Sequence, residues 1–219
     1  MMKPPLIEHD TLAIRAKNLL HDMIIRGDLR QGQRLTEVQI ANQLGISRAC
    51  IREAFIELMR EGLIVKEVNR YTAVVHLTKK DAQDIMEVRN TIEMMALEHW
   101  RDCTEKQLVQ LREKADALLQ YDTTPTIERM ICDMKFHEQI VIGSHNERAV
   151  AIWRQMADLV MMMCYIACKR NPAYLKMGEL HFKTVDALER GDFSAARDVL
   201  AMHLRGTMEV SIAGIVDDV

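Results

Sequence analysis

Residues 36–62 read TEVQIANQLGISRACIREAFIELMREG and decide the fold of the first part of the chain. Thr36, followed by Gln39 three residues later, matches a helix capping box. Gly45 can take the left-handed conformation that ends a helix, and Ser47 can cap the next helix. The stretch therefore predicts two helices joined by a tight turn. Apolar residues at helical spacing, expected to face inward, are Ile40, Ala41, Leu44, Ile51, Ala54, Phe55 and Leu58.

Two arginines stand near the start of the second predicted helix. Arg48 and Arg52 lie one turn apart and off the apolar stripe. A helix-turn-helix protein places the residues that enter the major groove at this point. The alternative is an ordinary helical hairpin with solvated arginines. The combination Ala-x-x-x-Gly-x-Ser followed by Arg-x-x-x-Arg-Glu favours DNA binding.

The flanking residues predict a winged helix. A helix is expected from Thr11, as its cap, to about Arg26, and two β-prone runs, 63–66 and 72–75, follow the helix pair. The hairpin between them would form a wing with Arg70 at its tip, close to the DNA backbone or minor groove. The complete set of expected DNA contacts is Thr36, Ser47, Arg48, Arg52 and Arg70.

Length and composition indicate a soluble globular protein, long enough for two small domains or one large one. The chain has 219 residues, of which 48% are hydrophobic and 28% charged. The longest apolar run, residues 159–168, is too short to span a bilayer, and no signal peptide is recognisable. Five scattered cysteines without a CxxC motif fit reduced thiols. We therefore expect a cytoplasmic protein without a membrane partner.

Charge differs between the two parts of the chain. Residues 1–76 hold 11 Lys and Arg against 9 Asp and Glu, whereas the remainder holds 18 against 23, so a net charge of −3 divides into +2 and −5. A mildly basic first part and an acidic second part suit a DNA-binding domain joined to a separate sensing domain.

The second part of the chain shows helical patterns and no strand signal. Thr78, with Asp81 three residues later, predicts a capping box at its start. The expected fold is thus mainly α: a winged helix-turn-helix in residues 1–76, followed by an all-α six-helix bundle in residues 77–219. The expected helices are 79–101, 105–120, 126–143, 147–168, 173–190 and 193–214.

Four ionisable residues fall on apolar helix faces of the predicted bundle. Asp133 and His137 lie four residues apart in the third helix, His181 in the fifth and His203 in the sixth. A buried, unpaired carboxylate costs several kcal/mol. The alternative is that each histidine is a satisfied core residue. For one carboxylate and three imidazoles together, a bound divalent cation is favoured, because it would satisfy all four groups.

Arg89 is a further charge on an inner face, together with Ile85, Ile92 and Ala96. Glu93, one turn later, is the obvious local partner. The guanidinium could equally bind the carboxylate of a ligand. The sequence leaves these two interpretations open.

Motifs in both parts resemble those of the GntR family of bacterial transcription regulators, in the FadR-like branch with an FCD sensing domain. The first part carries Gly-x-Leu-x-x-Gly-x-x-Leu at 27–35, Gly-Ile-Ser-Arg at 45–48, Arg-Glu-Ala at 52–54 and Glu-Gly-Leu at 61–63. The second carries Arg-x-x-x-Glu at 89–93, Asp-x-x-x-His at 133–137 and a run from His181 to Leu204.

The resemblance implies a function for each part of the chain. It implies that Asp133, His137, His181 and His203 bind zinc, nickel or manganese, that a small organic acid completes the coordination, and that Arg89 also contacts the acid. It further implies a homodimer that binds palindromic operator DNA with an affinity set by the acid.

Four residues at three sites depart from the family pattern. Gln31 stands where the family usually has proline, Ala49-Cys50 where it often has Thr-Pro, and Tyr71 where the wing usually has glycine. Glycine in the wing lets the backbone approach DNA closely. We expect these changes to affect which operator sequence the protein recognises more than whether it binds DNA.

The residues therefore predict a ligand-responsive transcription regulator, most simply a repressor, and not an enzyme. One alternative is a metal sensor in which the ion itself is the signal. Another is a metal-dependent enzyme, since an Asp-His-His-His site with an open position could activate water. An enzyme, however, gives no reason for the DNA-binding part.

Overall fold

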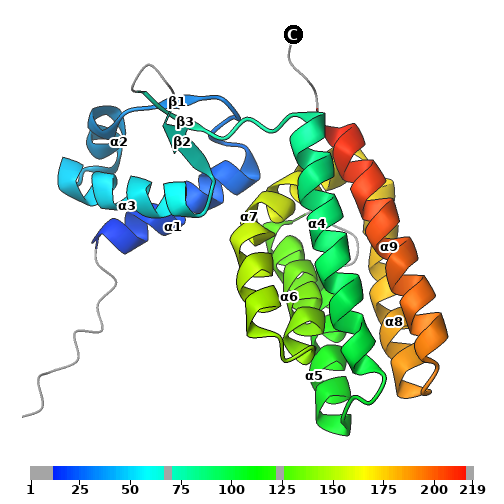
Figure 1. Cartoon of the computed structure of the whole chain (residues 1–219). Helices are drawn as coiled ribbons and strands as arrows, with labels where there is room; N and C mark the ends of the chain where they lie inside the picture. The colour runs from blue at the N-terminus through cyan, green and yellow to red at the C-terminus, as the bar shows by residue number, and fades with distance from the viewer. Residues whose placement is uncertain (1–11, 67–70, 122–125, 216–219) are drawn as a thin grey trace, which may run out of the picture. The chain divides into compact units, whose positions relative to one another are not determined.

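The computed structural model describes residues 12–66, 71–121 and 126–215. The chain divides into two compact units, Met1–His76 and Leu77–Val219. Figure 1 shows a small mixed unit and a larger unit that is entirely helical in its described residues.

The first unit is a winged helix-turn-helix. Its strands form an antiparallel sheet in the order β1-β3-β2. The elements are α1 (Leu12–Arg26), β1 (Arg34–Leu35), α2 (Glu37–Leu44), α3 (Arg48–Arg60), β2 (Ile64–Lys66) and β3 (Thr72–Val74).

The helix caps and the glycine turn of the helix-turn-helix are confirmed, whereas of the capping box predicted at Thr36 and Gln39 the structure shows the bond to the Thr36 side chain. Thr36 accepts a hydrogen bond from the backbone N–H of Gln39, and Ser47 accepts one from Cys50. Gly45 closes α2 with a φ of 67°, in the left-handed region. The predicted hairpin is also present. Strand β1, which pairs with β3, was not predicted, because two residues are too few to show a periodicity.

The second unit contains the six predicted α-helices. They are α4 (Lys79–Leu97), α5 (Glu105–Asp116), α6 (Ile127–Gly143), α7 (Glu147–Arg170), α8 (Glu179–Glu189) and α9 (Phe193–Gly214). Short 3₁₀ helices follow α4 and α5: η1 (Glu98–Trp100) and η2 (Ala117–Tyr121). The predicted capping box of Thr78 and Asp81 opens α4.

One predicted helix is wrong over its first third. Instead of a continuous helix 173–190, the chain forms the 3₁₀ helix η3 (Pro172–Gly178) and then α8. Carbonyl groups of η3 accept hydrogen bonds from side chains of other helices: that of Leu175 from Arg129 and that of Met177 from His203. These tertiary bonds replace regular helical bonds, and sequence periodicity does not reveal them.

Helix α7 is the core helix of the bundle. By length and composition the 24 residues of α7 could cross a membrane. The sequence-based prediction of no membrane span considered only the shorter apolar run 159–168, which lies within this helix. It packs against α4, α6 and α9. Its buried face includes Trp153, Met161, Met162 and Met163. We therefore interpret α7 as a core helix.

Trp100 connects η1 to α6 through a buried indole ring and one hydrogen bond. Its indole is 1% exposed, and Nε1 donates a hydrogen bond to the carbonyl of Ile140 over 2.9 Å. Gly143, one turn after Ile140, leaves room for the ring, since a Cβ atom there would overlap the indole. The close packing of α6 against η1 thus depends on glycine, which has no side chain, at position 143.

We predict that Gly143→Ala destabilises the second unit by about 1–3 kcal/mol, because the added methyl forces the indole or the helix to move. Urea denaturation followed by tryptophan fluorescence measures the effect. The matched control is Lys135→Ala, at an exposed position of the same helix. Equal stability of the two variants would contradict the packing described here.

Candidate metal centre and nucleic-acid interface

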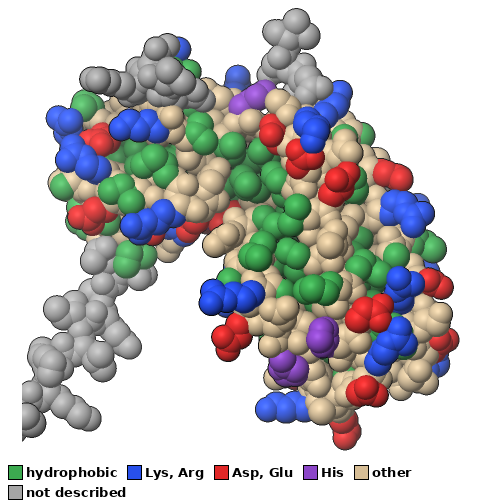
Figure 2. All heavy atoms as spheres, in the orientation of Figure 1, with side chains coloured by type: hydrophobic (Ala, Val, Ile, Leu, Met, Phe, Trp, Pro, Cys, Tyr) green, Lys and Arg blue, Asp and Glu red, His purple; other side chains and the backbone are tan. Residues whose placement is uncertain are grey.

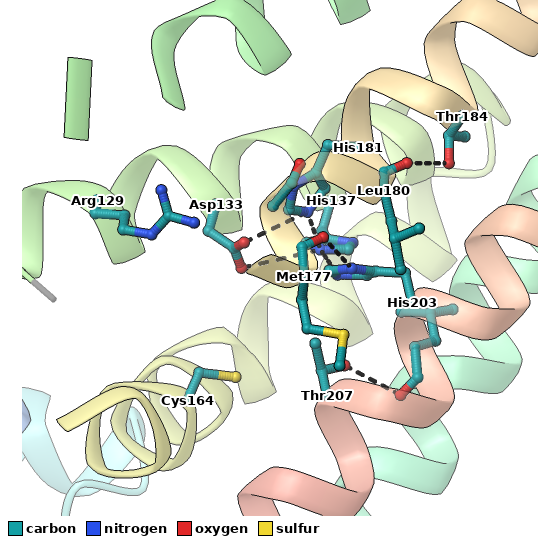
Figure 3. Close-up of polar contacts among 12 residues, drawn as sticks. Arg129, Asp133, His137, Cys164, Met177, Leu180, His181, Thr184, His203 and Thr207 are labelled. Carbon is teal, nitrogen blue, oxygen red and sulfur yellow. Dashed lines mark hydrogen bonds and ion pairs between the residues drawn. The ribbon is translucent and has the colours of Figure 1, made fainter. Parts of the chain in front are cut away.

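Four side chains from three helices converge inside the second unit. Asp133 and His137 project from α6, His181 from α8 and His203 from α9 (Figure 3). All four are at most 4% exposed, and one donor atom of each lies within 4.8 Å of the others. The structure therefore brings together the four residues that the sequence singled out.

Each imidazole is held through its Nδ1 atom. His137 Nδ1 lies 2.6 Å from a carboxylate oxygen of Glu93, His181 Nδ1 lies 3.1 Å from the carbonyl oxygen of Gly178, and His203 Nδ1 lies 3.2 Å from that of Met177. Carbonyl and carboxylate oxygens only accept hydrogen bonds, so each Nδ1 carries the proton. In the neutral rings, Nε2 then carries a lone pair.

The three Nε2 atoms face one another. His137 Nε2 lies 3.1 Å from both His181 Nε2 and His203 Nε2. With the protons on Nδ1, these contacts bring lone pairs together and are not hydrogen bonds. A metal ion with bonds of about 2.0–2.1 Å to nitrogen separates its nitrogen ligands by roughly 2.9–3.4 Å. The spacing therefore fits a bound cation.

Asp133 supplies a carboxylate to the same point. Its Oδ1 lies 3.4 Å from His181 Nε2 and its Oδ2 lies 3.9 Å from His137 Nε2. Oδ2 is buried without a hydrogen-bond partner. Buried polar atoms are rarely left unsatisfied, so this oxygen is available to an ion. Imidazole and carboxylate ligands together suit zinc, nickel or manganese.

Burial keeps the imidazoles of His181 and His203 in the form that binds a metal. Burial, followed by the neighbouring His137 ring, lowers the pKa of His181 well below its usual value. Burial, followed by the His181 and His137 rings, does the same to the pKa of His203. Both rings are therefore neutral near pH 7, which is the form that binds metal ions.

Glu93 joins the centre to the rest of the core. One oxygen accepts from His137, and the other accepts from Arg89 Nε at 2.7 Å and from Trp153 Nε1 at 3.0 Å. Burial opposes ionisation, but Arg89 and His137 hold the pKa of the carboxyl well below its usual value. A carboxylate behind a metal-binding histidine fixes the orientation of the ring.

Arg89 shows features of both interpretations left open by the sequence. Its Nε is bonded to Glu93, as the local-partner interpretation expects. Its Nη1 and Nη2 are buried and have no hydrogen-bond partner. A guanidinium has five N–H donors, and here four of them are free. The pairing therefore orients Arg89 and leaves its outer edge free for an anionic group.

Part of this site was not predicted from the sequence. Tyr174 was not among the expected site residues, yet its hydroxyl is buried without a nitrogen or oxygen partner and interacts with the Cys164 thiol. The carbonyls of Met177 and Gly178 were not expected to hold imidazoles, because a regular helix would have used them. A phenol on an apolar stripe was the one available signal for Tyr174.

The helix-turn-helix presents the other expected functional residues. The side chains of Arg48 and Arg52 on α3 are 63% and 59% exposed. Figure 2 shows Lys and Arg side chains gathered over the end of this unit that carries α2 and α3, with acidic side chains between them. Thr36 and Ser47 cap the two helices. Arg70 lies outside the described residues.

Glu37 contacts both Arg48 and Arg52 and was not predicted as a site residue. Its carboxylate accepts hydrogen bonds from Arg52 Nε at 3.0 Å and Nη2 at 2.9 Å, and Arg48 Nη2 lies 3.9 Å from it. This bidentate pair uses one edge of the Arg52 guanidinium and leaves the outer Nη1–Nη2 edge free. Glu37 lies 15 residues before Arg52, so only the folded helix pair reveals the contact.

Two family models match the two units. Residues 12–74 match bacterial regulatory proteins of the gntR family. Residues 84–206 match the FCD domain. Together the matches cover most of both units, and the boundary between the units lies in the gap between the matches.

Individual proteins are similar over most of the chain. An "Uncharacterized HTH-type transcriptional regulator YdhC" of Bacillus subtilis (strain 168) is 32% identical, over 88% of this chain and 87% of that protein. A "Probable D-xylose utilization operon transcriptional repressor" of Paenarthrobacter nicotinovorans is 27% identical, over 89% and 86%. The crystal structure of a GntR regulator from Rhodococcus sp. RHA1 shares the fold, with a TM-score of 0.75, 23% identity and coverage of 93% and 98%.

We predict that Glu93→Ala costs about 3–5 kcal/mol of stability, because it leaves the buried Arg89 unpaired and His137 without its acceptor. Urea denaturation of the metal-free full-length chain measures the loss. Glu87→Ala, which removes an exposed carboxylate from the same helix, should change stability by less than about 0.5 kcal/mol. A Glu93 variant as stable as the Glu87 variant would show that Glu93 does not hold the core together.

Proposed function

This chain belongs to the GntR family of bacterial transcription regulators, in the branch with an FCD domain, and we propose that it is a repressor. In this proposal, a small organic acid bound at a metal site sets the affinity of the protein for its operator. The chain is a transcription regulator and not an enzyme. The observation that carries the metal-site half of the proposal is the convergence of three imidazole lone pairs on one point.

In the proposal, Asp133, His137, His181 and His203 hold a divalent ion, with zinc, nickel or manganese as candidates. When bound, the ion supplies a Lewis acid to which a carboxylate can bind. Arg89 supplies the second contact, because its free Nη1 and Nη2 atoms match the two oxygens of a carboxylate. The acid would change operator affinity by binding two states of the protein unequally.

The DNA half of the proposal uses Thr36, Ser47, Arg48, Arg52 and Arg70. An arginine with a free outer edge can bind guanine through O6 and N7. The capping hydroxyls of Thr36 and Ser47 are expected at the phosphate backbone. We also propose that the protein is a cytoplasmic homodimer and reads a palindromic operator, as two-fold symmetric helix-turn-helix proteins do.

A metal sensor is the second candidate. Four protein side chains converge here, which is enough to hold an ion without an external ligand. The two candidates differ in one result. If the ion is the signal, adding and removing metal changes operator binding without any acid; if the acid is the signal, metal alone leaves operator binding unchanged.

We predict that Arg52→Ala weakens binding to a selected operator by about 1–3 kcal/mol, as expected for the loss of a base contact. Gel-shift titration at fixed salt measures the change. Affinity for random DNA should fall much less. Unchanged operator affinity would contradict the placement of the reading helix.

A Glu37→Gln variant separates orientation from charge. Removing a carboxylate should strengthen non-specific DNA binding, because the surface becomes more positive. Loss of the clamp on Arg52 should nevertheless weaken operator binding, so the ratio of specific to non-specific affinity should fall. Glu57→Gln removes an exposed carboxylate of α3 that pairs with Arg60, and it should leave this ratio unchanged. An equal ratio in both variants would refute the clamp.

We predict that one equivalent of zinc or nickel binds per chain and stabilises it, by about 4 kcal/mol when the free ion exceeds the Kd a thousandfold. Chelation should reverse the shift in thermal unfolding. His203→Ala should abolish it, whereas His99→Ala, at an exposed position of η1, should retain it. A shift that survives in the His203 variant would place the metal elsewhere.

A further inference from the structure

Arg129 is a buried cation near the metal centre that is neither a proposed ligand nor a proposed contact for the acid. It lies on α6, one turn before Asp133, and is 2% exposed. Figure 3 shows its side chain beside that of Asp133. A buried charge is costly unless hydrogen bonds satisfy it, so the partners of this guanidinium indicate its role.

The partners of Arg129 are backbone carbonyls of two 3₁₀ helices. Its Nη2 donates to the carbonyl of Leu175 in η3 over 3.0 Å, and its Nη1 donates to the carbonyl of Tyr121 in η2 over 3.4 Å. Its third nitrogen, Nε, is buried without a partner. A guanidinium bound through two nitrogens has a fixed orientation, which a single ammonium group would not have. These bonds tie the first turn of α6 to both segments.

Gly178 brings a second part of η3 against the same guanidinium. A Cβ atom at position 178 would lie 2.6 Å from Arg129 Nη2 and 3.7 Å from its Cζ atom. Glycine has no Cβ atom and therefore allows the guanidinium to lie directly against the backbone. Arg129 thus contacts η3 on both sides of Met177, at Leu175 and at Gly178.

The part of η3 that Arg129 contacts is also the part that orients two imidazoles. The carbonyl of Met177 accepts the Nδ1–H of His203 at 3.2 Å. The carbonyl of Gly178 accepts the Nδ1–H of His181 at 3.1 Å. A hydrogen bond behind a metal-binding histidine fixes the direction of its other nitrogen. The position of η3 therefore determines where the Nε2 atoms of both rings point.

We propose that Arg129 is a positioning residue of the metal centre: by holding η3 against α6, it directs the imidazoles of His181 and His203 towards the ion. The inference rests on the metal site proposed above. A guanidinium has no lone pair to offer an ion, so Arg129 acts only through η3. By charge alone, a cation beside the site weakens metal binding. Positioning and charge therefore predict opposite effects when the arginine is removed.

Arg129→Met, which is neutral and has a flexible apolar side chain, separates the two effects. Zinc affinity of the full-length chain should fall by about 10- to 100-fold, the usual loss when a partner behind a metal ligand is removed. Competition with a chromophoric chelator measures the Kd. Arg129→Lys keeps the charge and a donor, and its affinity should fall less. Lys135→Met removes an exposed positive charge from the same helix and should leave the affinity unchanged.

Gly178→Ala disturbs the same contact from the other side. The added methyl group overlaps Arg129 Nη2 and displaces the guanidinium, while the charge of the protein stays the same. Zinc affinity should therefore fall in this variant too. An affinity equal to that of the unaltered chain would contradict the role given to this contact.

Nuclear magnetic resonance of the metal-free chain tests the positioning without zinc. With ¹⁵N-labelled histidine, the Nδ1–H signals of His181 and His203 should be visible in the unaltered chain, because buried carbonyls hold these protons. In Arg129→Met both signals should shift or disappear. The signal of His137 should stay, because Glu93 on α4, and not η3, holds its Nδ1 atom.

The outcomes separate this inference from the proposed function. If the unaltered chain binds no zinc, the metal site itself is wrong, and Arg129 has no site to position. If the unaltered chain binds zinc and Arg129→Met binds it equally or more tightly, only the role of Arg129 is wrong. Equal loss of all three Nδ1–H signals would also overturn that role, because the disturbance would then not run through η3.

Discussion

Hydrogen bonds at three Nδ1 atoms determine where three imidazole lone pairs point. Several elements of the second unit supply the acceptors of these hydrogen bonds. Glu93 on α4 holds the ring of His137, and carbonyls at the end of η3 hold those of His181 and His203. None of these acceptors can give a proton to nitrogen. The Nε2 atoms are thus left as bases in a buried core, where a cation would satisfy them all.

The same constraint links the centre to its surroundings. Glu93 also pairs with Arg89 and Trp153, so α4 and α7 both depend on the carboxylate that positions His137. The 3₁₀ geometry of η3 turns the carbonyls of Met177 and Gly178 towards α9 and α8. A group that binds between Arg89 and the imidazoles would contact α4 and the metal ligands of α6, α8 and α9 together. Such a site can favour one arrangement of the helices over another.

The sequence predicted the features that follow from helical periodicity or from local capping signals. Asp133, His137, His181 and His203 stood out because each is a polar residue on an apolar helical stripe. The caps at Thr36 and Ser47 and the glycine turn at Gly45 are local signals and were confirmed. The contact of Glu37 with Arg52 spans two helices, and η3 is shaped by side chains distant in sequence, so neither follows from local pattern.

X-ray absorption at the metal edge tests the central claim most directly. The full-length chain loaded with one equivalent of zinc should show a first shell of nitrogen and oxygen, with the outer-shell scattering of three imidazoles. Sulfur in the first shell, or scattering from fewer than three imidazoles, would contradict the convergence of His137, His181 and His203 on one ion.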